Sequence, residues 1–217
     1  MSTITKQIAT QKITFITDKK TDADWFELKK HLLEPNNELY WLLAYNDFFY
    51  GRIYSRYLNP ISKLQPYDEY CGYGFTIMAI NCSLIEFLES TYKGKKYRYC
   101  KDKELTDHEY NKSKDCFLDF LLSKQPFKEC FKDRKIAEIF YSDIRCGLLH
   151  EATTKNGWRI WADSDSGNEI IDKKNQIVFR NDFSAAIKKY MAIYRDELIT
   201  NTELQANFIR KFDWICE

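Results

Sequence analysis

The chain has 217 residues, of which 44% are hydrophobic, 16% aromatic and 30% charged. Glycine and proline are scarce, with 7 and 4 residues, which excludes collagen and low-complexity linkers and favours long, well-packed helices. The 33 basic and 32 acidic side chains nearly cancel, so any binding to nucleic acid requires a local basic patch.

The sequence predicts neither a membrane span nor a metal site. No apolar run reaches the roughly 18 residues that a transmembrane helix needs, and residues 1–18 lack the apolar segment of a signal peptide. The 7 cysteines are scattered and never spaced as CxxC. We therefore expect reduced thiols, no zinc and no other cofactor in a cytoplasmic protein.

An N-terminal arm with a short helix is expected over residues 1–36, ahead of one helical domain over residues 37–217. The first residues alternate loosely between polar and apolar, as in a strand or a frayed arm. Thr21 or Asp22 is expected to cap the short helix, because their side-chain oxygens accept hydrogen bonds from a first helical turn. Pro35 is expected to end it.

Two long helices are expected to open the domain. The first spans residues 37–58 and is expected to stop at Pro60, since proline lacks the N–H that continues a helix. The second spans residues 71–92, where apolar side chains recur at steps of three and four. Asn81 is the polar interruption of that stripe, and a buried amide needs partners. It is interpreted either as part of a cleft or as a contact between two helices.

The middle of the chain is predicted to alternate between loop and helix. Residues 93–112 are polar and predict a loop, followed by short helices over 113–123 and 127–131. A longer helix is predicted over residues 133–150, because one stripe of apolar residues recurs at a strict step of four. The stripe consists of Ile136, Phe140, Ile144 and Leu148.

Short β-prone runs follow Gly157 and predict a small antiparallel β meander over residues 158–180. Helical periodicity then returns over residues 182–214, with an expected break near Thr200. The predicted fold is therefore mainly α, a helical bundle with one small antiparallel β insertion.

One pair of residues at the end of the predicted 133–150 helix has the chemistry of RNA cleavage. Attack by a 2′-hydroxyl on the adjacent phosphate needs a proton acceptor, a proton donor and a cation over the phosphate. The pKa of histidine suits the proton transfers, so His150 is the candidate acid and base. The planar guanidinium of Arg145 suits the charge that develops on the phosphate oxygens.

The segment from Arg145 to His150 resembles the motif of the HEPN superfamily, in which four to six residues separate an arginine from a histidine. Residues 75–90 also resemble the first core helix of that fold. Members are small helical bundles, and many are metal-independent endoribonucleases whose two protomers share one cleft. The resemblance, which covers residues 37–215, implies a HEPN-like bundle, catalysis by Arg145 and His150, and a homodimer that acts on tRNA or another structured RNA. It also implies a toxin or defence effector with an antitoxin or sensor protein as its partner.

The spacing of the two residues favours a site shared between protomers. Five positions on an ideal α-helix, at about 100° each, turn His150 about 140° away from Arg145. Either Gly147 bends or ends the helix, or a two-fold dimer brings one protomer's Arg145 beside the partner's His150. Asp143 lies on nearly the same side as His150 but about 10 Å along the axis. It is therefore expected to support the site by holding Arg145 or its symmetry mate.

A non-catalytic interpretation remains open from the sequence. An arginine and a histidine near a helix end commonly form salt bridges or interact with the helix dipole. Apolar Cys146 follows the arginine, where RNA-cleaving members of the family often carry a polar residue. Ala152 stands where members paired with a nucleotidyltransferase antitoxin tend to carry the tyrosine that is modified. The alternative is a HEPN scaffold that dimerises and binds RNA or a protein without cutting. Glu86, on the 71–92 helix, is a further supporting candidate.

A basic, aromatic stretch supplies the local patch that the net charge does not. Lysines, an arginine and tyrosines interleave over residues 92–101, a composition suited to gripping phosphates and stacking bases. A loop that is merely solvated has the same composition. The predicted RNA contacts are Lys93, Lys95, Lys96, Tyr97 and Arg98.

Overall fold

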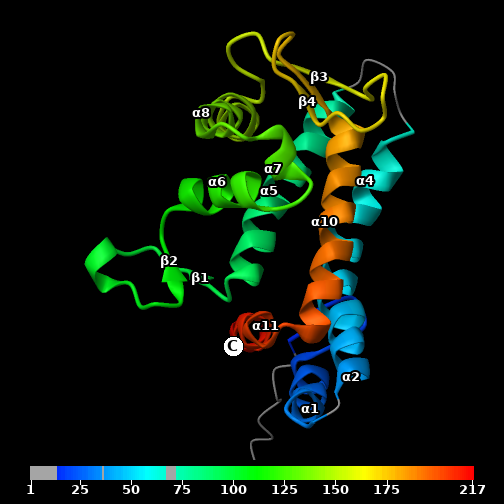
Figure 1. Cartoon of the computed structure of the whole chain (residues 1–217), viewed down its shortest axis with the longest axis vertical. Coiled ribbons are helices and arrows are strands. Elements are labelled where there is room, and N and C mark those ends of the chain that lie inside the picture. Colours follow the sequence, from blue (N-terminus) through cyan, green and yellow to red (C-terminus); the bar gives the residue numbers. More distant parts are fainter. Residues whose placement is uncertain (1–13, 36, 67–71) are drawn as a thin grey trace, which may run out of the picture.

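The computed structural model describes residues 14–35, 37–66 and 72–217, so the predictions for residues 1–13 and for Cys71 lie outside the described part. The chain is mainly helical, with long helices packed side by side and a small sheet at one end (Figure 1). The helices are α1 (Asp22–Leu32), α2 (Glu38–Leu43), α3 (Gly51–Ile53), α4 (Asn59–Leu64), α5 (Tyr73–Tyr92), α6 (Ser113–Ser123), α7 (Phe127–Cys130), α8 (Arg134–Ile139), α9 (Cys146–His150), α10 (Arg180–Thr200) and α11 (Thr202–Cys216). Turns of π-helix are η1 (Ala44–Tyr50), η2 (Tyr54–Leu58) and η4 (Phe140–Arg145), and η3 (Asp102–Glu104) is a 3₁₀ turn. The strands are β1 (Lys96–Tyr97), β2 (Glu109–Tyr110), β3 (Arg159–Trp161), β4 (Ile171–Asp172) and β5 (Ile177–Phe179).

Helix α1 begins at the predicted cap and ends before Pro35. The Thr21 side chain accepts a hydrogen bond from the Asp24 N–H, and the Asp24 carboxylate accepts one in return from the Thr21 N–H. Trp25 is completely buried and donates its indole N–H to Asp213 in α11 at 2.9 Å. The described part of the N-terminal arm therefore shares one apolar core with the rest of the chain.

The first long helix runs from Glu38 to Leu64 without a break, so the expectation that Pro60 stops it is wrong. Two of its segments, η1 and η2, are π-helical. A proline inside an α-helix loses one hydrogen bond, and its ring crowds the carbonyl one turn earlier. The wider turn of η2 lies just before Pro60 and lets the helix pass the proline.

Helix α5 lies at the centre of the bundle and packs against α6, α10 and α11 (Figure 1). It confirms the predicted second helix. Aromatic rings fill the neighbouring core: Phe140 stacks on Phe183 with ring centroids 5.6 Å apart, and Phe127 meets Phe183 edge-on at 5.2 Å. Such pairs stabilise a core beyond the area that they bury.

The helix that carries the candidate site forms as one continuous segment, α8 followed by η4 and α9. Its predicted apolar stripe faces the core, with Phe140 and Ile144 fully buried and Leu148 9% exposed. A strict step of four drifts by about 40° per step around an ideal α-helix. The π-helical turn interrupts that drift in the middle of the stripe, and the apolar side chains stay on the buried side.

The β insertion lies where the sequence predicts it, but it is not an antiparallel meander. Strand β5 is central and pairs in parallel with β3 and antiparallel with β4. A short turn joins β4 to β5, as antiparallel neighbours allow, whereas parallel neighbours need a longer connection. The segment between β3 and β5 supplies that connection and includes β4. Local composition predicts the strands here but not their pairing, because the pairing depends on the path of the chain between them.

Residues 93–112 hold more structure than the expected loop. Strands β1 and β2 pair in parallel within it, and η3 lies between them. At the other end of the chain, the predicted break near Thr200 is confirmed. Asn201 separates α10 from α11, and its side chain caps α11 by accepting hydrogen bonds from the N–H groups of Glu203 and Leu204.

Within the described residues, no helix is both long enough and apolar enough to pass through a membrane. The cysteines of that part of the chain are unpaired thiols, and three of them, Cys82, Cys116 and Cys216, are buried. Burial raises the pKa of each of these three thiols to about 12, so they stay protonated at neutral pH.

Candidate functional site

Arg145 lies at the end of η4 and is half-buried. Its guanidinium stands 5.2 Å from the ring centroid of Tyr141, and its Nη1 is 4.0 Å from the Cys146 sulfur. It forms no ion pair with a carboxylate of the described residues. An arginine that is held by a ring, and whose charge no acidic partner neutralises, is available to an anion.

His150 is the last residue of α9 and is exposed. Its imidazole has no hydrogen-bond partner within the described ranges. Residues 146–150 are α-helical, and Arg145 ends the π-helical turn before them. Five positions on an ideal α-helix correspond to about 140°, which favours different sides of the helix for the two side chains. Neither residue is part of the lining of the pockets of about 320, 300, 190 and 170 Å³ in the described part of the chain.

Gly147 allows the chain after His150 to fold back onto the helix. It lies inside α9 and does not end it. A Cβ atom at this position would lie 2.5 Å from the backbone oxygen of Thr153, a contact that forces the turn to move. The glycine thus positions the turn beside His150 and does not bring His150 closer to Arg145.

Asp143 holds the same turn. It is 6% exposed and accepts hydrogen bonds from the Ser142 hydroxyl at 2.6 Å and the Asn156 amide at 3.1 Å. Its backbone carbonyl accepts another from the Lys155 N–H at 2.9 Å. No hydrogen bond or ion pair joins it to Arg145 in the described structure. Within one chain, its contacts support the shape of the helix end.

The two supporting candidates on α5 lie in different surroundings. Asn81 is fully buried and donates to the Ser184 hydroxyl of α10 at 2.8 Å, so it forms the helix–helix contact that was one of its two interpretations. Glu86 accepts hydrogen bonds from the Tyr110 hydroxyl at 3.0 Å and the Ser113 hydroxyl at 2.8 Å. Neither forms a hydrogen bond with Arg145 or His150.

Electrostatics nevertheless connect Glu86 with the arginine. Burial raises the pKa of Tyr141, the neighbouring positive charge of Arg145 opposes that rise, and the negative charge of Glu86 adds to it. Tyr141, which the sequence analysis did not single out, thus senses the charges of both side chains.

Carboxylates neutralise most of the cations in the predicted RNA-binding stretch. Lys96 pairs with Glu217 at 2.9 Å, and Arg98 pairs with Glu109 at 3.1 Å. The ring of Tyr97 meets that of Tyr110 edge-on at 5.5 Å. The ammonium groups of Lys95 and Lys101 are the exceptions, because neither has a carboxylate partner among the described residues. The predicted RNA contacts in this stretch stay a prediction, and Lys95 is the predicted contact whose charge no described carboxylate compensates.

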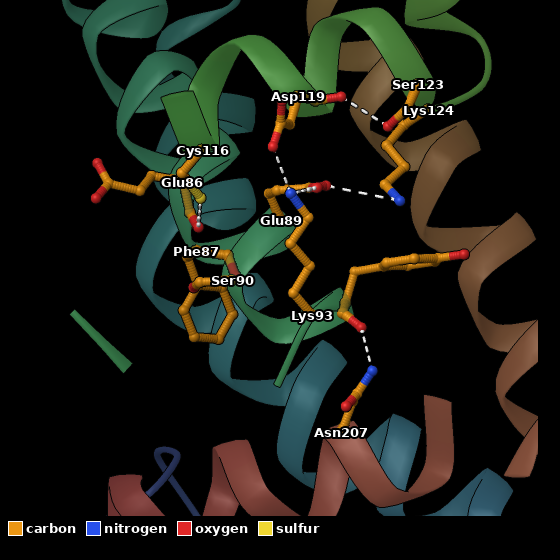
Figure 2. Close-up of polar contacts among 11 residues, drawn as sticks. Glu86, Phe87, Glu89, Ser90, Lys93, Cys116, Asp119, Ser123, Lys124 and Asn207 are labelled. Atoms are coloured by element: carbon orange, nitrogen blue, oxygen red, sulfur yellow. Dashed lines mark hydrogen bonds and ion pairs between the residues drawn. The ribbon is translucent and has the colours of Figure 1, made fainter. Parts of the chain in front are cut away.

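Lys93, the fourth cation among the predicted RNA contacts, belongs to an ion cluster around the buried carboxylate of Glu89 (Figure 2). The Glu89 side chain is 1% exposed and lies 3.0 Å from the Lys93 ammonium and 3.7 Å from that of Lys124. Lys93 also contacts Asp119 at 2.5 Å. Lys124 lies 3.0 Å from the ring centroid of Tyr92. Burial lowers the pKa of Lys124, while the negative charge of Glu89 raises it.

A second buried cation anchors the start of the stretch. Lys211, in α11, is 9% exposed and donates to the Ser90 hydroxyl at 2.7 Å and to the Lys95 carbonyl at 2.9 Å. Burial lowers its pKa to about 8. Ser90 and Lys95 also line a pocket of about 320 Å³, whose lining contains both acidic and basic side chains.

A surface that the sequence analysis missed lies between the first long helix and α10. It is a groove of about 300 Å³. We call it the tyrosine groove, and it is lined by Tyr45, Asn46, Tyr50, Lys188, Met191, Ala192 and Arg195. The available signal was the spacing of Tyr50 and Tyr54, which puts two tyrosines on one face of a helix.

Comparison with known proteins returns no relative: no family model, no curated protein and no solved structure matches the chain. The described residues also contain no group of three or more His, Cys, Asp or Glu side chains that could hold a metal ion.

Proposed function

We propose that the protein is a metal-independent endoribonuclease with a HEPN-like bundle and a site shared between two protomers. The observation that carries the proposal is the pairing of two available groups at one helix end. The Arg145 guanidinium has no carboxylate partner among the described residues, and His150 is exposed. Their angular separation in one chain is the reason for placing the active site between two chains.

In the shared cleft, Arg145 of one protomer lies beside the partner's His150. The imidazole accepts the 2′-hydroxyl proton, the 2′-oxygen attacks phosphorus, and the bond from phosphorus to the 5′-oxygen breaks. The imidazolium formed in this way then donates that proton to the leaving 5′-oxygen. Arg145 stabilises the charge on the non-bridging oxygens. The products are a 2′,3′-cyclic phosphate and a 5′-hydroxyl.

The apolar surface beside His150 supports the dimer. Leu149 directly precedes it in α9 and is 47% exposed. A leucine next to the catalytic candidate gives two copies of this helix end an apolar contact to bury. Burying that contact would bring each His150 towards the opposite protomer, which is where the proposed mechanism needs it.

Cleavage of tRNA in EDTA by the purified full chain tests the proposal. The wild-type protein is expected to produce 2′,3′-cyclic phosphate ends, because side chains perform the proton transfers. His150→Ala and Arg145→Ala are each expected to lose about 10²–10³ in rate. Mixing the two inactive variants is expected to restore part of the activity, since a mixed dimer retains one intact composite site.

Matched substitutions at other exposed residues control for surface charge. Arg134→Ala changes an arginine at the start of the same helix, and His108→Ala changes a histidine in the 93–112 segment. Both are expected to cut at the wild-type rate. Equal rates for wild type, Arg145→Ala and His150→Ala, with all three folded and dimeric, would show that these residues are not catalytic.

The alternative is a scaffold that dimerises and binds RNA or a protein partner without cutting. One observation favours it: neither Arg145 nor His150 lines any of the described pockets of 170–320 Å³ in the single chain. A wild-type protein that binds tRNA in a gel-shift assay but leaves it intact would support the scaffold.

A further inference from the structure

The tyrosine groove presents a fixed row of aromatic rings. Tyr45 is buried, and its hydroxyl donates to the Met191 carbonyl of α10 at 2.9 Å, which joins the two walls of the groove. Tyr50 stacks near Tyr45 with centroids 6.3 Å apart and near Tyr54 with centroids 5.8 Å apart. Tyr50 is 40% exposed. A planar ligand can therefore stack on a ring that its neighbours already hold in place.

The charge of the groove suits an anion. Its described lining contains no aspartate or glutamate, whereas four acidic residues line the pocket of about 320 Å³ beside Lys95. Lys188 is exposed and forms no ion pair with any residue in the described ranges. Arg195 is partly compensated, because it pairs with Asp196 at 2.7 Å. Lys188 is thus the main uncompensated charge.

An amide completes the set of groups. Asn46 is exposed on the same wall as Tyr50, and its side chain has no hydrogen-bond partner among the described residues. An asparagine amide offers both a donor and an acceptor. An aromatic face, an amide and a cation within one groove are the three kinds of group that recognise an unpaired nucleotide.

We propose that the tyrosine groove binds a nucleotide of single-stranded RNA. The base stacks on Tyr50, the base edge bonds to the Asn46 amide, and the phosphate contacts Lys188. The choice of RNA rests on the proposed function, but binding can be measured without cleavage. Because α5 lies between the groove-forming helices and α8 (Figure 1), the groove contributes affinity and takes no part in bond breaking.

Fluorescence anisotropy tests the proposal with a labelled single-stranded RNA of about ten nucleotides. The full chain carries His150→Ala, so the RNA stays intact. Tyr50→Ala is expected to raise Kd by about tenfold, the usual effect of losing one base–aromatic stack. Lys188→Ala is expected to weaken binding and to lower the slope of log K against log salt by about 0.7, the value for one phosphate contact on a single strand.

Lys189→Ala is the matched control, because Lys189 is the next residue of α10, is also exposed and lies outside the groove. It is expected to change Kd less than twofold. The proposal is overturned if Tyr50→Ala and Lys188→Ala behave like Lys189→Ala, or if the starting protein binds no RNA. It is also overturned if these variants keep RNA affinity but lose the dimer in light scattering, which would make the groove a protein interface. Competition by a free mononucleotide at the same concentration as the RNA would assign the groove to a small ligand.

The two proposals fail separately. If RNA binding depends on Tyr50 but the wild-type protein does not cleave RNA, the groove proposal stands and the nuclease proposal is wrong. If cleavage requires His150 but Tyr50→Ala has the wild-type KM, the nuclease proposal stands and the groove proposal is wrong. If both hold, groove variants are expected to raise KM and to leave kcat unchanged.

Discussion

The 93–112 segment and the tyrosine groove contain the same residue types, cations interleaved with tyrosines, but differ in how the charges are compensated. In the segment, Lys93, Lys96, Arg98 and Lys112 each pair with at least one carboxylate, whereas Lys95, Lys101 and Lys103 have no such partner among the described residues. In the groove, no acidic residue is part of the described lining, and Lys188 has no ion-pair partner there. Lys211 also donates a hydrogen bond to the Lys95 carbonyl of the segment, whereas the groove opens to solvent.

Counting cations therefore does not locate a phosphate site. A lysine that already faces a carboxylate must lose or share that partner before it can neutralise a phosphate. A lysine without one can neutralise a phosphate directly, and the counterions that the nucleic acid then releases to solvent supply a large share of its affinity. The predictions below test whether the segment is built mainly for stability and the groove for binding.

The largest effect is expected from removing the buried carboxylate that holds Lys93. Glu89→Leu leaves the ammonium of Lys124 buried without its carboxylate partner, and breaking a buried pair costs about 3–5 kcal/mol of unfolding free energy. Urea denaturation measures the loss. Asp119→Asn is the control, since the Asp119 side chain is 47% exposed, and it is expected to cost about 1 kcal/mol or less. Equal losses in the two variants would contradict the structural role of the cluster.

A pH-dependent effect is expected from Lys211. Its pKa falls from 10.5 to about 8 on folding, so between these values the unfolded chain binds more protons than the folded chain. The cost of the buried charge is fully present below pH 8 and is relieved as the pH rises towards 10.5. Relative to Lys211→Met, the wild type is therefore expected to gain roughly 3 kcal/mol at most over this window.

Urea denaturation of both proteins across the window measures this difference. The comparison with Lys211→Met removes the contribution of the tyrosines and thiols that titrate in the same range. A difference between the two proteins that stays constant from pH 8 to pH 10.5 would show that Lys211 is not the titrating group.

The smallest effects are expected from the paired cations of the segment. Lys96→Ala and Arg98→Ala are each expected to change the Kd for single-stranded RNA by less than twofold, because Glu217 and Glu109 already compensate them. Lys95→Ala, which removes a predicted contact that has no carboxylate partner, is expected to have a larger effect than either. Anisotropy in the His150→Ala background measures all three. If Lys96→Ala lowers RNA affinity as much as Lys188→Ala does, the two regions do not differ in phosphate binding.

Much of the helical framework could be predicted because its signals are local. Thr21 caps α1, the apolar spacing over residues 71–92 predicts α5, and the stripe ending at Leu148 predicts the helix of the candidate site. The helix end predicted at Pro60 was wrong, since a π-helical turn lets a proline stay inside a helix. The pairing of β3 with β5 was also beyond local pattern, because it depends on how the chain returns to the sheet.

The candidate site divides in the same way. The types and spacing of Arg145 and His150 are properties of the sequence, and the α-helical turn between them follows from local periodicity. That Asp143 holds a turn, that Asn81 meets Ser184, and that Arg145 has a ring and not a carboxylate beside it could not be predicted. Each of these contacts joins side chains whose proximity depends on the folded chain.

The sequence alone indicates where most helices lie and which residues are candidates for RNA cleavage. These properties depend on side-chain type and on spacing within a few turns. Which charges are neutralised, and where a groove opens, depends on the tertiary structure. Tyr45 and the Met191 carbonyl are 146 residues apart in the chain, and Lys211 reaches Ser90 across 121 residues. Contacts of that range are set by how whole helices pack, because packing fixes which side chains meet and which remain exposed to solvent.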